Sequence, residues 1–210
     1  ADLHLELPTT LGDISYSYRN RKPLPEVISR TAPDGYEWKM ELVGRSAYAF
    51  LLRRIMHLEA DPDAIVSKAL DQTPGALLDL VPTQSGKADL VLRSGDLLAQ
   101  FLSLDLEHVH SQLRTTLGGN GQIEISALFA ECGKDEITTV VPVHIQTEKG
   151  SLQANKILRN LSYASIQFPN TPCRAVVVQV LDHNVLALFE IEKEFDELRI
   201  VQEHHVRLIR

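Results

Sequence analysis

Hydrophobic and polar positions alternate most clearly in the middle of the chain, in two runs over residues 122–130 and 137–146. Such alternation is typical of β-strands, because successive side chains of a strand point to opposite faces. The connector over residues 131–136 is polar and contains Gly133 and Asp135, which suit a turn. We therefore expect the two runs to form a β-hairpin.

Polar side chains fall at alternate positions of both predicted strands. Glu124 and Ser126 share one face of the first strand, and His144 and Gln146 share one face of the second. Because the two strands are neighbours, these four side chains can converge on one spot, which is the best candidate for a functional site. The same alternation is also typical of a hairpin with one face in water, and the pattern alone leaves both interpretations open.

The remaining periodicity predicts further strands and helices on either side of this hairpin. The strands are expected over 36–55 (two strands around Gly44), 173–181, 184–192 and, as one or two edge strands, 198–210. The helices are expected over 62–70, 74–81, about 90–113 and 151–168. Ser94 and Gly95 are expected to interrupt the third, and Ser151 to cap the last.

These elements predict an α/β fold with a mixed β-sheet flanked by helices and a smaller β-containing N-terminal region. The polar run at 83–89 is the expected boundary between an N-terminal region, 1–82, and a core domain, 83–210.

The composition, with 44% hydrophobic and 23% charged residues among 210, is that of an ordinary globular protein. No apolar run reaches the length of a membrane span, and the first residues lack the layout of a signal peptide. Cys132 and Cys173 have no metal-ligand spacing, and two thiols indicate a reducing compartment. We therefore expect a cytoplasmic protein without a membrane partner.

Charge is distributed unevenly along the chain. Residues 17–54 contain eight Lys or Arg and four acidic residues, a net charge of +4, so the rest carries −11 of the total of −7. Arg19, Arg21 and Lys22 are candidates for a phosphate-contacting arm, because guanidinium groups suit phosphate oxygens. The alternative is a solvated loop. Arg114, expected at the end of a helix, is a further phosphate-binding candidate.

Three segments together resemble a known superfamily. LRTTLGGNGQIEIS, VVPVHIQTEKG and CRAVVVQVLDHNVLALFEIE, at 113–126, 140–150 and 173–192, are similar to bacterial endonucleases of the PD-(D/E)XK, or restriction-endonuclease-like, type. The resemblance covers roughly residues 90–192. It implies an α/β core of helix, hairpin, helix and strand, and DNA as the partner, with Lys149 as a further nucleic-acid-binding residue.

The resemblance also assigns roles on the hairpin, with substitutions. The metal-binding Asp of the superfamily would fall at Ser126, its second acidic residue at His144 and its Lys at Gln146. These three residues and Glu124 are thus the catalytic candidates, and Glu124 is the only carboxylate left to hold Mg²⁺ or Mn²⁺. His144 could act as a general base or a cationic stabiliser.

Two functions follow from the resemblance and stay open at this point. The chain is a DNA-binding protein of this class, either an active metal-dependent endonuclease in DNA restriction or phage defence, or an inactive relative that supports a partner subunit. A homodimer is expected if both DNA strands are cut. The sequence does not distinguish DNA from RNA as the substrate.

Overall fold

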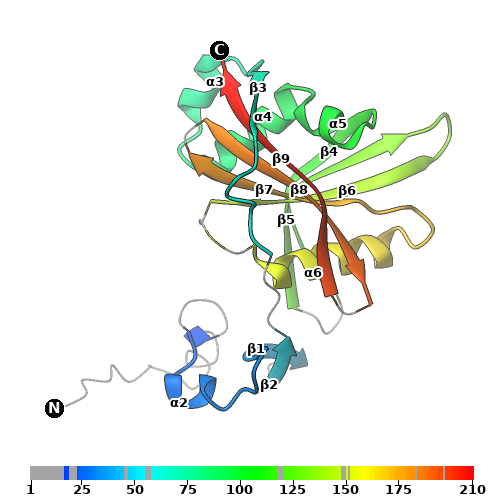
Figure 1. Ribbon diagram of the computed structural model, residues 1–210. Helices are drawn as coiled ribbons and strands as arrows, with labels where there is room; N and C mark the ends of the chain where they lie inside the picture. The colour runs from blue at the N-terminus through cyan, green and yellow to red at the C-terminus, as the bar shows by residue number, and fades with distance from the viewer. Residues whose placement is uncertain are drawn as a thin grey trace. The chain divides into compact units, whose positions relative to one another are not determined.

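The protein is described by a computed structural model for residues 17–18, 23–44, 47–54, 58–117, 121–147, 150, 152–182, 184–195 and 197–210. The chain divides into two compact units, one of residues 1–55 and 116–121 and one of residues 56–115 and 122–210. The predicted α/β class is confirmed, since a seven-stranded mixed sheet is flanked by helices and a separate two-stranded antiparallel sheet lies in the N-terminal part of the chain (Figure 1).

The first unit contains helix α2 (Glu26–Ser29) and the two strands β1 (Tyr36–Gly44) and β2 (Ala47–Arg54). The strands pair antiparallel around Gly44, as predicted. Directly opposite residues share a face, so the register places aromatic and aliphatic side chains together on one side of this small sheet. Those with described side chains are Tyr36, Trp38, Met40, Tyr48, Phe50 and Leu52.

The second unit is built on the seven-stranded sheet, whose order is β3-β9-β8-β7-β6-β5-β4. Strands β5 and β6 are antiparallel, β6 and β7 are parallel, and β7, β8 and β9 are antiparallel to one another in turn, with β3 parallel to β9. The strands are β3 (Val66–Leu70), β4 (Leu106–Leu117), β5 (Gly121–Cys132), β6 (Ile137–Gln146), β7 (Ala175–Asp182), β8 (Val185–Glu194) and β9 (Glu197–Ile209).

Helices cover both faces of this sheet (Figure 1). On one face, Val141, Val143 and Ile145 of β6 belong to a core with Leu92 and Phe101. On the other face, residues from β7, β8 and β9 pack with α6 around a second core. The helices of the first face are α3 (Gly75–Leu80), α4 (Gln84–Ser94) and α5 (Leu97–Leu102), and that of the second is α6 (Ala154–Gln167).

The hairpin at 122–130 and 137–146 is confirmed as β5 and β6, and the buried strands β7 and β8 also lie where the pattern predicts them. Helices α3 and α6 fall within their predicted ranges, although α6 begins after Gln153. The expected cap Ser151 lies outside the described residues.

The helix predicted over 62–70 is wrong, because Val66–Leu70 form strand β3, which pairs parallel with β9. Pairing with a neighbouring strand outweighs the local helical pattern of this short run. Strand β9 is a single strand and lies inside the sheet, not at its edge, because β3 covers its outer side.

The interruption expected at Ser94 and Gly95 is confirmed, but the continuation of the predicted helix to about residue 113 is wrong. Helix α4 ends at Ser94, with Gly95 as its C-cap, and α5 ends at Leu102, before Ser103, whose left-handed backbone (φ 55°) stops the helix. The chain then continues as strand β4. Residues 84–89 of the expected domain boundary form the first turns of α4, and β3 and α3 belong to the second unit.

Candidate functional site

The four hairpin candidates lie on the neighbouring strands β5 and β6, on one face of the sheet. Leu128 pairs with Pro142 and Ala130 with Val140, so the even-numbered residues of both strands share a face. This is the face that α6 covers, because the odd-numbered residues of β6 pack on the core under α4 and α5. The predicted grouping of the four positions on adjacent strands is therefore present.

Ser126 takes part in holding the two strands together. Its Oγ accepts a hydrogen bond from the backbone N–H of Ile145 at 2.9 Å. The backbone register of β5 and β6 begins next to it, at Ala127 opposite Val143. Ser126 is half-buried and supports the hairpin where the backbone ladder starts.

Gln146 is almost fully buried, with 1% of its surface exposed. Its Oε1 accepts the backbone N–H of Gln153, the residue that precedes the first turn of α6, at 3.1 Å. A donor at a helix start needs such an acceptor, because the first N–H groups have no partner within the helix. The position that the resemblance assigns to the superfamily's Lys therefore holds a neutral side chain, which joins the start of α6 to the sheet.

A second glutamine, which the sequence analysis missed, completes this attachment. Gln179 lies beside Gln146 in the parallel register of β6 and β7 and is also 1% exposed. Its Nε2 donates to the carbonyl of Gly150 at 3.0 Å. The signal was present in the sequence, since Gln179 is the one polar residue inside the apolar run 175–181.

Glu124 stands apart from this buried group, at the exposed part of β5. Its Oε1 lies 3.1 Å from Nη2 of Arg114, and both side chains are more than half exposed. Arg114 lies on β4 and not at a helix end, so this predicted phosphate-binding residue forms an ion pair with the predicted metal ligand. The pair partly neutralises the only carboxylate among the four hairpin candidates.

His144 is buried, with 5% of its surface exposed, under the α6 side of the sheet. Asn160 lies on the buried side of α6 with Ile157 and Ala164. The face between β6 and α6 therefore contains imidazole and amide groups but no buried carboxylate at the candidate positions.

These residues do not fit a site for Mg²⁺ or Mn²⁺. Both ions prefer oxygen ligands and usually bind one or two carboxylates, whereas Glu124 is exposed and already paired with Arg114. Across the residues that the structure describes, no group of three or more His, Cys, Asp or Glu side chains is arranged to hold a metal ion.

The remaining nucleic-acid candidates, Arg19, Arg21, Lys22 and Lys149, lie outside the described residues. The histidines before Arg114 lie on strand β4. His108 contacts Ser111 (Nε2 to Oγ, 3.0 Å), and Ser111 donates to Asp89 of α4 at 3.1 Å. This chain of hydrogen bonds joins the edge strand to the helix layer.

Within the described part of the chain, none of the helices combines the length and the apolar character that a membrane span requires. Comparison with protein-family models, with curated proteins and with solved structures finds no match to this chain.

Proposed function

We propose that this chain is a DNA-binding protein of the restriction-endonuclease-like class that does not itself cleave DNA. The proposal is supported by the order of elements from α5 through the strands β4, β5 and β6 to α6 and β7, which agrees with the family resemblance. It is supported above all by Gln146, which occupies the family's Lys position and is buried in a hydrogen bond to the start of α6.

Phosphodiester hydrolysis in this class would need a neutralised divalent ion and a positive charge near the phosphate in the transition state. Glu124 alone provides weak neutralisation, and the amide of Gln146 carries no charge. His144 is buried beneath α6, so its imidazole does not substitute for either group. We therefore expect no cleavage in Mg²⁺ or Mn²⁺.

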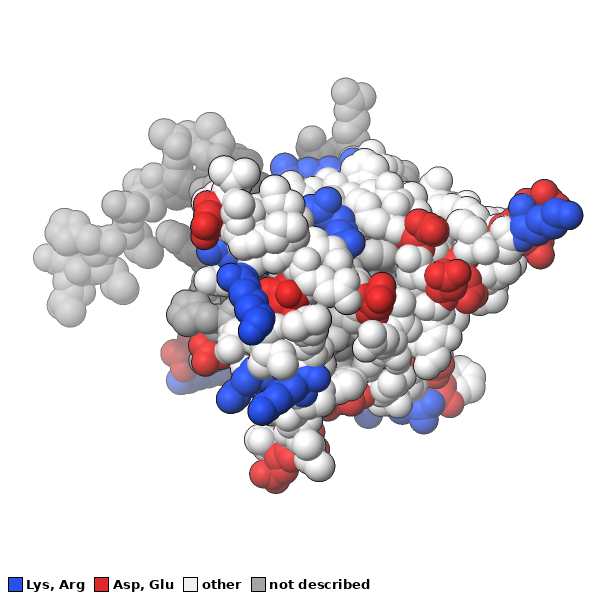
Figure 2. Space-filling model, turned by 90° about the horizontal axis from the view of Figure 1, so that it is seen from above, with Lys and Arg blue, Asp and Glu red and all other residues white. Residues whose placement is uncertain are grey.

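DNA binding would depend on local basic groups, because the whole chain is acidic. The +4 charge of residues 17–54 supplies such groups. Figure 2 shows basic and acidic side chains interspersed on the face seen from above, without a continuous basic surface. A few phosphate contacts from the N-terminal arginines suit this distribution better than a broad electrostatic footprint does.

The binding experiment compares the full chain with a variant in which Arg19, Arg21 and Lys22 are all replaced by Gln. Fluorescence anisotropy with a labelled duplex at several salt concentrations should show weaker binding and a flatter salt dependence, by about 0.9 log units for each lost phosphate contact. A matched control replaces three exposed lysines elsewhere by Gln, namely Lys134, Lys156 and Lys193. Equal binding by both variants would contradict the proposed arm.

Plasmid nicking in Mg²⁺, in Mn²⁺ and in EDTA tests the absence of cleavage. The wild type should leave supercoiled plasmid intact, and Ser126→Asp with Gln146→Lys should raise metal-dependent nicking if that variant folds. Wild-type cleavage that Glu124→Ala abolishes would show that the chain is an active nuclease.

A second candidate function, support of a partner subunit, is favoured by the apolar face of the β1–β2 sheet. Tyr36, Tyr48, Phe50 and Leu52 on that face are each between 37% and 45% exposed, and exposed apolar patches mark interaction sites. Light scattering of the wild type and of Phe50→Ser tests a homodimer. A monomer in both cases would leave only a different protein as the partner.

A further inference from the structure

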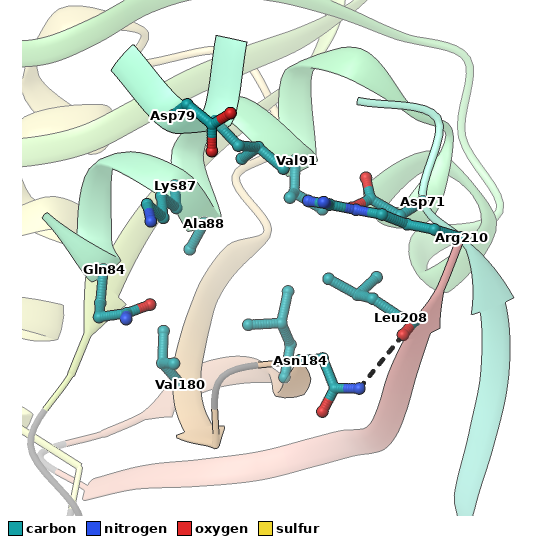
Figure 3. Close-up of a pocket in the computed structure, with 12 residues that line it drawn as sticks. Asp71, Asp79, Gln84, Lys87, Ala88, Val91, Val180, Asn184, Leu208 and Arg210 are labelled. Carbon is teal, nitrogen blue, oxygen red and sulfur yellow. Dashed lines mark hydrogen bonds and ion pairs between the residues drawn. The ribbon is translucent and has the colours of Figure 1, made fainter. Parts of the chain in front are cut away.

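A pocket of about 480 Å³ lies on the α4 side of the sheet, on the face opposite the hairpin candidates. Figure 3 shows the residues that line it. Its size is in the range of small-molecule sites, about 300–1,000 Å³. Its floor is aliphatic and comes from the helices α3 and α4 and the strands β7, β8 and β9. The floor residues are Leu78, Ala88, Val91, Val180, Leu186 and Leu208.

The rim holds two cations from distant parts of the chain. Lys87 lies on α4 and Arg210 follows β9, and Figure 3 shows them on opposite sides of the pocket. Among the described residues, the side chain of Lys87 has no hydrogen-bond or ion-pair partner, although it is half-buried. No carboxylate of the described residues lies within ion-pair distance of this ammonium group, which borders an apolar surface.

Arg210 is fixed in place by Asp71. The Nε of Arg210 lies 3.1 Å from Oδ2 of Asp71, whose side chain is only 4% exposed. Burial opposes the charge on Asp71, but hydrogen bonds from Thr73 and Arg210 outweigh it and hold the pKa of this carboxyl below its usual value. The carboxylate therefore binds one edge of the guanidinium group, while the two terminal nitrogens make no other bond within the described structure.

We propose that this pocket binds a small organic carboxylate with an apolar body, such as a medium-chain fatty acid. The apolar part packs on the leucine and valine floor, and the carboxylate lies at the rim, where the Lys87 ammonium and the terminal nitrogens of Arg210 provide positive charge. Asp79 of α3 also borders the pocket and repels such a ligand. Removing the positive charge of Lys87 should weaken carboxylate binding, and removing the negative charge of Asp79 should strengthen it.

The site is independent of the proposed DNA-related function. The pocket and the hairpin candidates lie on opposite faces of the sheet, and no residue is shared. Loss of carboxylate binding would not affect the DNA experiments, and the reverse also holds.

Isothermal titration of the full chain with octanoate, and with octan-1-ol as an uncharged control, tests the proposal. Octanoate should bind more tightly than the alcohol. Lys87→Gln should weaken octanoate binding by about three- to tenfold, or about 0.7–1.4 kcal/mol, and leave octan-1-ol unchanged. Asp79→Asn should strengthen octanoate binding by a comparable factor. Amide shifts in a two-dimensional NMR spectrum should map to α4 and the end of β9.

Ala88→Phe fills the floor of the pocket and should abolish binding of both probes, with circular dichroism as the check on folding. If Ala88→Phe does not fold, the Lys87 and Asp79 variants still test the proposal. Absence of octanoate binding up to its solubility limit would overturn the proposal. Equal affinity for octanoate and octan-1-ol would also overturn it. The same holds if the Lys87 and Asp79 variants do not change octanoate affinity in opposite directions.

Discussion

The buried hydrogen bond of Gln146 predicts that a lysine at this position, where the resemblance places the superfamily's Lys, will destabilise the fold. Gln146→Lys places an ammonium group where 1% of the side chain is exposed. Burial lowers the pKa of a lysine, so the cheapest response of the protein is to bury the neutral amine. Relative to an ordinary lysine pKa near 10.4, deprotonation at pH 7 costs about 1.36 kcal/mol for each of about 3.4 pH units, or about 4.6 kcal/mol.

The sign of the pH dependence follows from the same argument. The folded-state pKa lies below the unfolded one, so the loss of stability is complete below the folded pKa and shrinks as pH rises towards 10.4. At pH 9.5 the cost falls to about 1.2 kcal/mol, a recovery of about 3.4 kcal/mol. Gln146→Met removes the acceptor without adding a charge and should cost about 1–3 kcal/mol at both pH values.

Urea denaturation at pH 7 and 9.5, followed by far-UV circular dichroism, measures these differences against the wild type at each pH. Circular dichroism is preferred because Trp38, the only tryptophan, belongs to the first unit, whereas Gln146 belongs to the second. A Gln146→Lys protein as stable as the wild type at pH 7 would refute the burial of this position. A cost that does not change with pH would refute the charge argument.

Three further predictions concern other parts of the second unit. Arg174→Met should lower the free energy of unfolding, measured by chemical denaturation, by about 3 kcal/mol or more. The substitution leaves the buried Glu190 carboxylate, which Arg174 binds at 2.6 and 2.8 Å, without its partner. Replacing both residues by Met should recover most of this loss. Burial raises the pKa of the Cys173 thiol to about 11, so iodoacetamide near pH 7.5 should modify the exposed Cys132 first, and equal rates by mass spectrometry would contradict this. Arg114→Ala should change the free energy of unfolding by less than about 1 kcal/mol, because its ion pair is exposed.

The parts of the fold that the sequence predicts correctly are those where local pattern and tertiary environment agree. The strands β5 and β6 alternate cleanly, and β7 is a continuous apolar run, as buried parallel strands are. The wrong predictions fall on segments whose secondary structure depends on tertiary contacts. Val66–Leu70 has too few residues to reveal its period, and only its pairing with β9 makes it a strand.

The sequence predicts which residues of the candidate site share a face, but it does not predict which of them are buried. Alternation places Glu124, Ser126, His144 and Gln146 on one face, but it carries no information about which helix covers that face. Exposure of Glu124 and burial of Gln146 depend on where α6 packs. The carboxylate pocket was not predictable at all, because its rim joins Lys87 to a residue more than a hundred positions away.

Catalysis would need an accessible, charged side chain on the face under α6, whereas the fold buries a neutral side chain there. A phosphodiester that reached Glu124 would still be separated from the side chain of Gln146, because the segment before α6 covers that position. Uncovering it would require breaking the bond from Gln153 to Gln146 and the bond from Gln179 to Gly150, both of which satisfy buried polar groups. A neutral amide at the lysine position can form such a bond without burying a charge, whereas a lysine cannot. In the proposed function, the side chain that fastens α6 to the sheet is therefore the same one whose lack of charge prevents cleavage.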